Sequence, residues 1–488
     1  MGCQAARAKS RPGAGKFLPA AAYPVPKGAC GMGWRRWGRL LGAGVLGLLV
    51  LLLPAALLSP AGPGGAGTGL SAGQTATAAP GGQTAPGETA GETSGQTAAT
   101  AGPGGQTAPG ETAGETAGQT VAFPAGEYRA VWVSYLEWQR MDFSDAAAFR
   151  ADAAAMLDDI AGLGANVVLA HVRPFGDALY PSELFPWSHL AAGVQGRDPG
   201  FDPLAILVQA AHDRGLQLEA WVNPYRLQAG GVPEPGDGSL AAVHPDWVRR
   251  AGDGLYLDPA EPRVRAYIAA GVAELCAGYD IDGVHFDDYF YPTTDPAFDA
   301  DAYAAYCADA DDPLPLADWR RSNVDALVAL CCQTAHRYGV RFGVAPQGDP
   351  AQNRDAQYSD AARWLAEGGY VDYLMPQLYW GLEYQRGADT SHSLAELADA
   401  WLAMPRRGDV ALYFGLGAYR IGAGDGGDRT GPDSEWQRGD ALARQAEALA
   451  AAGGQGVGLY RYDSLFANDA FPGLAAREAD ALRDLWLT

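Results

Sequence analysis

Two adjacent aspartates, Asp287 and Asp288, follow a short apolar run that begins at Gly283, and aromatic residues up to Tyr291 come directly after them. Ionised carboxylates are costly to bury unless they are paired or take part in chemistry. Aromatic rings beside them suit stacking on a flat ligand such as a sugar ring. This segment therefore predicts the floor of an active site.

Strand alternation separates the two acids. In an extended run, His285 and Asp287 share one face, whereas Asp288 lies on the other. We therefore expect Asp287 to be the catalytic carboxylate that points into the site. Asp288 is then a supporting group, a sugar ligand or the partner acid. The alternative is that one of the two caps the following turn or pairs with an arginine.

The elements that must position these acids are eight β-then-α units between about Glu127 and Thr488, where short apolar runs alternate with helical patterns such as 146–160 and 203–214. Such an alternation predicts an α/β fold of the (β/α)8 TIM-barrel type, with its site at the carboxyl ends of the strands. The expected strands are 129–135, 166–173, 216–223, 281–288, 340–346, 371–379, 409–416 and 456–462.

The strand ends carry aromatic, amide and charged residues, which is the mixture that a polysaccharide site uses. We expect the substrate-binding residues to be His171, Arg173, Trp221, Asn223, His285, Tyr289, Gln377, Tyr379 and Trp380. Some have equally simple structural explanations. His171 and Arg173 suit a buried pair as well as a pocket wall, and Trp221 and Trp380 suit closure of the barrel rim.

Several motifs together resemble the bacterial glycosyl-hydrolase-like ten family. They are RAVWVSY from Arg129, HVRPFGDALYPSELFPWS from His171, GFDPL from Gly200, EAWVNPYR from Glu219, GVHFDDYFYP from Gly283 and MPQLYW from Met375. The resemblance covers nearly all of 127–488 and implies glycosidase chemistry on a cell-wall glycan, such as peptidoglycan strands that lack stem peptides. Two positions depart from the family pattern, which usually has His in place of Glu219 and an aromatic-rich loop in place of 345–349.

Glycosidic cleavage normally uses a second carboxyl. The candidates at other strand ends are Asp177, Glu219, Asp349, Glu383 and Asp463. The family resemblance favours Asp177 as the third catalytic residue beside Asp287 and Asp288, although Asp177 equally suits a role in bracing its loop.

Three other kinds of protein must be weighed against a glycan hydrolase. A chitinase-type motif would place Glu where Tyr289 stands, which disfavours that class. A polysaccharide deacetylase would add a histidine pair spaced by four, and none of the seven histidines has that spacing, so we expect no metal and no other cofactor. A non-catalytic glycan-binding barrel stays open as an alternative.

The N-terminal part predicts location. Residues 1–39 are basic, and 40–59 form an apolar run long enough to span a bilayer, which favours an uncleaved anchor over a cleaved signal peptide and an extracytoplasmic main domain. Residues 60–122 contain an 18-residue direct repeat and almost no large apolar side chain, which predicts a disordered linker. The net charge of −22 argues against a nucleic-acid partner. The expected partner is a polysaccharide, because of the strand-end residues and the family resemblance.

Overall fold

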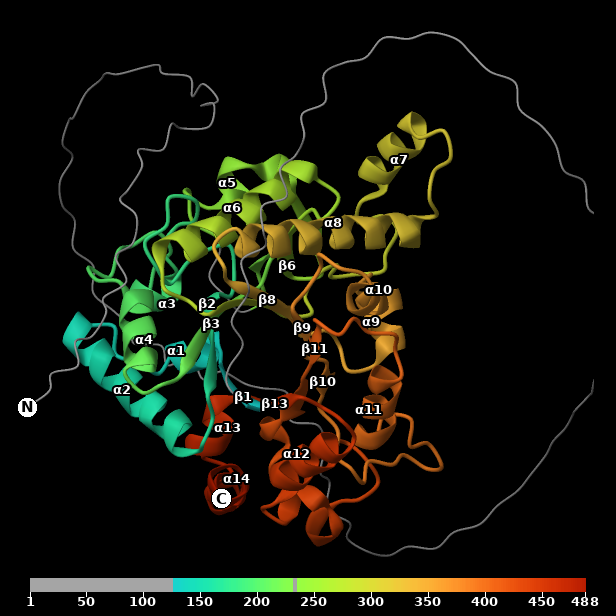
Figure 1. Cartoon of the computed structure of the whole chain (residues 1–488). Helices are drawn as coiled ribbons and strands as arrows, with labels where there is room; N and C mark the ends of the chain where they lie inside the picture. Colours follow the sequence, from blue (N-terminus) through green and yellow to red (C-terminus); the bar gives the residue numbers. More distant parts are fainter. Residues whose placement is uncertain (1–125, 231–234) are drawn as a thin grey trace, which may run out of the picture. The chain divides into compact units, whose positions relative to one another are not determined.

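The computed structural model describes residues 126–230 and 235–488, so the predictions for 1–122 lie outside the described residues. Ten strand segments form one parallel sheet that curls around its own core, with helices on the outside (Figure 1). Along the sheet the order is β10-β12-β13-β1-β2-β3-β7-β8-β9-β11. The predicted parallel α/β sheet is therefore confirmed.

Each predicted strand overlaps an observed one. The segments are β1 (Tyr128–Val133), β2 (Val167–Arg173), β3 (Gln217–Val222), β7 (Gly283–Phe286), β8 (Arg341–Val344), β9 (Tyr373–Leu374), β10 (Gln377–Leu378), β11 (Ala411–Leu412), β12 (Phe414–Gly417) and β13 (Gly456–Tyr460). The sixth and seventh predicted strands are each split into two segments, β9 with β10 and β11 with β12. β2 is buried along its whole length, as expected for a parallel strand that is covered on both faces.

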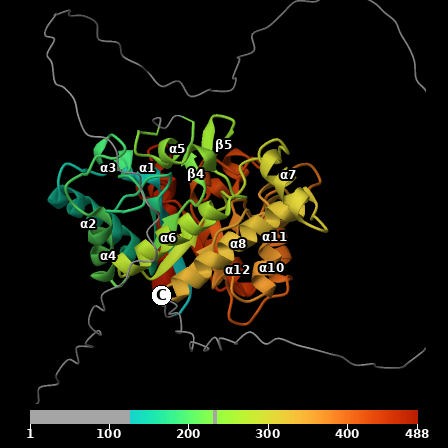
Figure 2. The same cartoon turned by 90° about the horizontal axis from the view of Figure 1, so that it is seen from above.

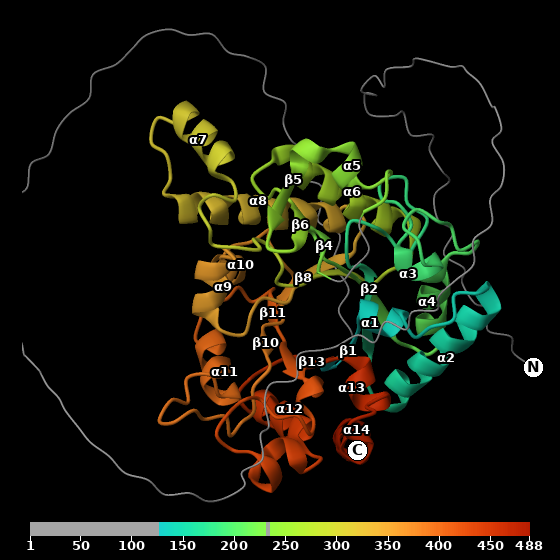
Figure 3. The same ribbon diagram turned by 180° about the vertical axis from the view of Figure 1, so that it is seen from behind.

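Helices cover the outside of the sheet (Figures 1 and 3). The longer ones are α2 (Ala146–Gly162), α4 (Pro203–His212), α6 (Pro262–Gly278), α8 (Leu316–His336), α11 (Leu394–Leu402), α12 (Ala441–Ala451) and α14 (Pro472–Leu487). Local signals set where they begin. Asp145 caps α2 by accepting from the N–H groups of Ala147 and Ala148, and Asp202 caps α4, which has proline at its first position.

Insertions after the strands gather on one side of the sheet, as Figure 2 shows. They include α1 (Tyr135–Trp138), α3 (His189–Ala192), α5 (Leu240–Val243), α7 (Ala300–Asp309) and a small antiparallel sheet of β4 (Arg226–Gln228), β5 (Val248–Ala251) and β6 (Gly254–Leu257). The sequence had not indicated this second sheet. Smaller helices α9 (Pro350–Ala356), α10 (Ala361–Ala366) and α13 (Tyr462–Phe466) complete the fold.

The interior of the curled sheet holds a buried ion pair rather than an entirely apolar core. Glu219 and Arg341 are fully buried and lie 2.8 Å apart, and the Tyr128 hydroxyl donates to Glu219 at 2.6 Å. Burial by itself raises the pKa of Glu219, but Arg341 and the hydroxyl donors outweigh it and hold the pKa below its ordinary value. Glu219, one of the candidate second acids, therefore stabilises the interior as a carboxylate.

Close packing in this interior requires glycine on the neighbouring strand. A Cβ atom at Gly343 would lie 2.0 Å from the ring of Tyr373, which is fully buried beside Glu219. Tyr373 also donates a short hydrogen bond to Glu219. The tyrosine ring thus occupies the space that a side chain on β8 would need.

Candidate active site

A pocket of about 240 Å³ lies at the carboxyl ends of the strands. Its walls combine two carboxylates, two amides and a majority of aromatic rings. The lining residues are Trp132, Trp221, Asp287, Asp288, Tyr289, Ala345, Gln347, Gln377, Tyr379, Tyr419 and Tyr460. The structure therefore brings together both aspartates of the FDDY segment and four of the predicted substrate-binding residues.

Asp287 is held by the end of the neighbouring strand β3. Its Oδ2 atom accepts hydrogen bonds from Trp221 Nε1 and Asn223 Nδ2, both at 3.2 Å, while its buried Oδ1 atom has no partner among the described residues. The side chain is almost fully buried. Burial, followed by the charge of Asp288, raises the pKa of Asp287 to about 7. A large fraction of Asp287 is therefore protonated near neutral pH.

Asp288 has a different environment, because side-chain amides surround it. Oδ2 accepts from Gln347 at 2.9 Å and from Gln357 at 3.0 Å, and Oδ1 accepts from Gln377 at 3.2 Å. All three partners donate N–H groups, so both oxygens of Asp288 accept hydrogen bonds.

Both aspartates line the pocket, which differs from the prediction that they face opposite ways. The reason is that β7 ends at Phe286, so strand alternation no longer governs the two residues that follow. Asp287 turns toward β3, and Asp288 turns toward the ends of β8 and β10. Two carboxyls in unlike environments, one of them with a raised pKa, are the combination that acid-assisted cleavage of a glycosidic bond uses.

A hydrogen-bonded chain supports the floor of the pocket. Trp132 Nε1 donates to His285 Nε2 at 3.2 Å, and His285 Nδ1 lies 2.7 Å from the Tyr373 hydroxyl, which in turn donates to Glu219. Since an indole nitrogen only donates, Nδ1 carries the imidazole proton. Burial lowers the pKa of His285 to about 4, so the ring is neutral. His285 therefore positions Trp132 and does not line the pocket itself.

Two aromatic side chains that line the pocket are accessible to a ligand. Tyr289, after β7, is 46% exposed, and Tyr419, after β12, is 38% exposed. Tyr379 and Tyr460, which also line the pocket, stack with ring centres 5.5 Å apart. Large exposed aromatic rings beside buried acids are suitable platforms for the faces of sugar rings.

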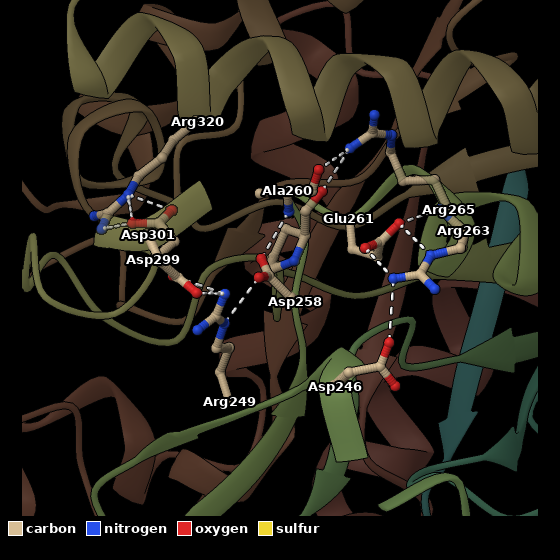
Figure 4. Close-up of polar contacts among 11 residues, drawn as sticks. Asp246, Arg249, Asp258, Ala260, Glu261, Arg263, Arg265, Asp299, Asp301 and Arg320 are labelled. Carbon is tan, nitrogen blue, oxygen red and sulfur yellow. Dashed lines mark hydrogen bonds and ion pairs between the residues drawn. The ribbon is translucent and has the colours of Figure 1, made fainter. Parts of the chain in front are cut away.

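The loop that carries the two aspartates is anchored by ion pairs at its far end (Figure 4). Arg320 of α8 and Asp299 are both fully buried, with Nη2 and Oδ1 2.5 Å apart, and Arg320 also donates to the Asp295 carbonyl at 2.8 Å. Asp301 of α7 pairs with Arg249 of β5 at 2.8 Å. These contacts fix the segment between β7 and α7, so the aspartates sit at one end of a loop that is held at the other.

Several predicted site residues lie outside the pocket lining. His171 stacks on Trp221 with centroids 3.6 Å apart and supports it from behind. Arg173 packs on Phe185 at 4.2 Å, away from the acids. Trp380 lies against His392 at a centroid distance of 5.2 Å. Asn223 is buried and reaches the site only through Asp287.

The remaining candidate acids also have other partners. Asp177 is buried and accepts from Gln195 and His189 at 3.2 Å each, which is the loop-bracing arrangement. Asp349 accepts from the first turn of α9. Glu383 pairs with Arg429, Arg438 and Arg444, and Asp463 pairs with Arg461. None of these acids lines the pocket with Asp287 and Asp288.

The sequence had not assigned Trp132, Gln347, Tyr419 and Tyr460, all of which line the pocket. Each lies in or directly after a predicted strand, so their position at strand ends was a readable signal. The sequence does not indicate which of the many polar and aromatic residues at the strand ends have side chains that line the pocket.

Two general features of the described part bear on cofactors and membranes. Within residues 126–230 and 235–488, no group of three or more His, Cys, Asp or Glu side chains is placed to hold a metal ion. Over the same residues, every helix is too short or too polar to cross a bilayer. The predicted anchor at 40–59 lies outside these residues.

The sequence that forms this fold matches a known family. Residues 127–430 match the model of the glycosyl hydrolase-like 10 family, and the chain belongs to that family. It is 37% identical over 320 residues to glycosyl hydrolase YngK of Bacillus subtilis, covering 60% of this chain and 61% of that protein. It is 36% identical over 292 residues to glycosyl hydrolase DigH of Escherichia coli K12, covering 54% of this chain and 65% of that one. The chain thus spans less than two thirds of the length of these relatives.

Solved structures give weaker likenesses. The glycoside hydrolase domain of PgaB (BpsB) from Bordetella bronchiseptica has a TM-score of 0.49 and 17% identity, covering 74% of this chain and 99% of that one. The catalytic domain of a β-amylase from Paenibacillus polymyxa has a TM-score of 0.47 and 14% identity, covering 73% and 98%. At these values the likenesses add nothing to the family assignment.

Proposed function

We propose that this protein hydrolyses glycosidic bonds in a polysaccharide of the bacterial envelope, with Asp287 as the general acid and Asp288 as the ionised partner. The observation that carries the proposal is the unlike environment of two acids in one pocket. Burial and the charge of Asp288 raise the pKa of Asp287 to about 7, whereas three amide donors surround Asp288. Protonation of the leaving oxygen and stabilisation of positive charge on the sugar need these two states.

The substrate that we propose is a β-linked amino-sugar polymer, most simply a peptidoglycan glycan strand without stem peptides. A polymer needs a site that is open on both sides. Tyr419 also lines a second hollow of about 330 Å³, and Tyr135 and Phe175 line a third of about 650 Å³ near Tyr289. Hollows next to the acid pocket support binding of several sugar units of one chain.

We further propose that the curled sheet is a closed (β/α)8 barrel. The strand order begins at β10 and ends at β11. β10 continues the strand that begins with β9, and β11 begins the strand that continues as β12. Gln377 of β10 is in register with Gly415 of β12, and Tyr373 of β9 is in register with Ala411 of β11. The strand made of β9 and β10 thus pairs with the strand made of β11 and β12 through both of its segments. This pairing joins the two ends of the strand order and supports a closed barrel.

Digestion of purified sacculi tests the activity. Sacculi treated beforehand with an amidase, and untreated sacculi, are incubated with wild-type protein, Asp287→Asn, Asp288→Asn and the matched control Asp355→Asn, whose aspartate is 71% exposed on α9. We expect new reducing ends from the wild type and the control on amidase-treated material, and a loss of at least about 1,000-fold in both site variants. Equal release by all four proteins would overturn the catalytic assignment. Binding to the glycan without any new reducing ends would favour the non-catalytic alternative.

The location of the protein is proposed on the sequence alone. We propose that residues 40–59 anchor the chain in the cytoplasmic membrane and that 60–122 act as a tether for an extracytoplasmic main domain. Protease treatment of intact spheroplasts tests this. The main domain is expected to be digested, and a protected main domain would contradict the proposed orientation.

A further inference from the structure

Arg226 lies behind aromatic residues that line the acid pocket and the neighbouring hollow, and it is not itself part of either lining. Its guanidinium carbon is 4.7 Å from the ring centre of Tyr289, which lines the acid pocket, and 5.0 Å from that of Phe175, which lines the hollow. Its Nε atom donates to the Pro174 carbonyl at 3.2 Å, and the side chain is only 8% exposed. The ring centre of Tyr135 lies 5.9 Å away, so three rings and a carbonyl hold the guanidinium in one position.

The position of Arg226 is also coupled to the acids. Its backbone N–H donates to Asn223 Oδ1 at 3.1 Å, and the amide of the same Asn223 donates to Asp287. Arg226 is close enough to Asp287 that its positive charge lowers the pKa of that carboxyl, against the larger effects of burial and Asp288. A group bound at this guanidinium would therefore sit beside the reacting bond.

Three other buried or half-buried arginines of the fold have carboxylate partners, whereas Arg173 at the end of β2 has terminal nitrogens without a described partner. Arg341 pairs with Glu219, Arg320 with Asp299, and Arg461 with Asp463. Over the described residues, Arg226 has no carboxylate within ion-pair distance, and its terminal nitrogens donate to no described group. A nearly buried cation in a chain with a net charge of −22 is costly to keep without an anionic partner, which makes it a ready receptor for one.

We propose that Arg226 is a specificity residue that binds a free carboxylate on the sugar adjacent to the cleaved bond. The inference rests on the proposed function and specifies the substrate: an acidic glycan. In peptidoglycan the lactyl carboxylate of muramic acid is free only where the stem peptide has been removed, because the peptide is joined to it by an amide bond. The planar guanidinium fork matches a carboxylate with two hydrogen bonds, and an amide offers it no charge and only one acceptor oxygen.

Chemically matched glycans test the inference. Amidase-treated strands are divided into two parts, and in one part the lactyl carboxylates are converted to methylamides. The catalytic efficiency kcat/KM is measured on both for wild-type protein, Arg226→Gln and Arg226→Lys, with thermal unfolding to verify that each variant folds. We expect the wild type to prefer the free carboxylate by about 10- to 100-fold, as for a charge-assisted hydrogen-bonded pair.

The ratio between the two substrates separates recognition from other effects of the variants. Arg226→Gln is expected to abolish the preference, and Arg226→Lys, which keeps the charge without the fork, to retain part of it. An effect through Asp287 changes the pH profile equally on both substrates and leaves their ratio unchanged. An unchanged ratio in a folded Arg226→Gln variant, or a wild type without preference, would overturn the inference. A wild type inactive on both glycans would overturn the proposed function instead.

Discussion

Replacement of Asp287 by asparagine is expected to stabilise the folded protein at and above neutral pH while it abolishes hydrolysis. The ionised carboxylate is nearly buried and lies beside a second acid, which is why its pKa is raised to about 7. Asparagine carries no charge and has a similar shape. Its carbonyl oxygen can take the place of Oδ2, which accepts from Trp221 and Asn223, and its amide can take the place of Oδ1, which has no partner.

The size of the effect follows from the pKa shift. In the folded protein the pKa of Asp287 moves from 3.8 to about 7, roughly three units, and at about 1.4 kcal/mol per unit the ionised form costs about 4 kcal/mol. Below pH 3.8 both folded and unfolded chains hold the proton, so there is no cost. Between 3.8 and 7 only the unfolded chain releases it, so the free energy of unfolding falls as the pH rises. Above 7 the cost is constant.

Urea unfolding followed by tryptophan fluorescence at pH 5 and pH 8 measures this. The stability difference between Asp287→Asn and wild type is expected to grow by roughly 2.5 kcal/mol between the two pH values. Asp355→Asn serves as the control, since its exposed carboxylate should give the same difference at both. If the Asp287→Asn difference is also independent of pH, the raised pKa and the role of Asp287 as an acid at neutral pH are refuted.

Three further substitutions test the surroundings of the acids. Trp221→Phe removes a hydrogen bond that lowers the pKa of Asp287 and is expected to move the basic limb of the kcat/KM profile up by about one pH unit; an unmoved limb between pH 5 and 9 contradicts this. Glu219→Gln removes the carboxylate that pairs with buried Arg341 and should cost about 3–5 kcal/mol in urea unfolding at pH 7, whereas an unchanged midpoint would show that the pair is dispensable. Tyr419→Ala removes an exposed ring and should raise KM for glycan about 5- to 10-fold with little effect on kcat; the reverse pattern would exclude a binding platform.

The sequence predicted the elements of this fold better than the contacts in its site. Apolar runs with helical segments between them located every strand of the parallel sheet, because burial on both faces leaves a strong local pattern. The partners of Asp288 leave no such pattern. Its three glutamines are 59, 69 and 89 residues away in the chain, and only the folded sheet brings them to one carboxylate. The position of Asp288 itself depended on where β7 ends, and strand ends are the least readable feature of a sequence.

The two adjacent acids differ in the hydrogen-bond donors that reach them. Two buried neighbouring carboxylates repel each other, so one ionises readily only if the other stays protonated. Asp288 receives three amide donors spread over both of its oxygens, whereas Asp287 receives two side-chain donors, both on Oδ2. The amide donors therefore gather on Asp288, whereas burial and the charge of Asp288 raise the pKa of Asp287 to about 7. The donors to Asp288 come from the segment after β8 and from the first residue of β10, and those to Asp287 come from the end of β3. The environments of the two acids are thus set by different parts of the sheet and can be altered separately by substitution.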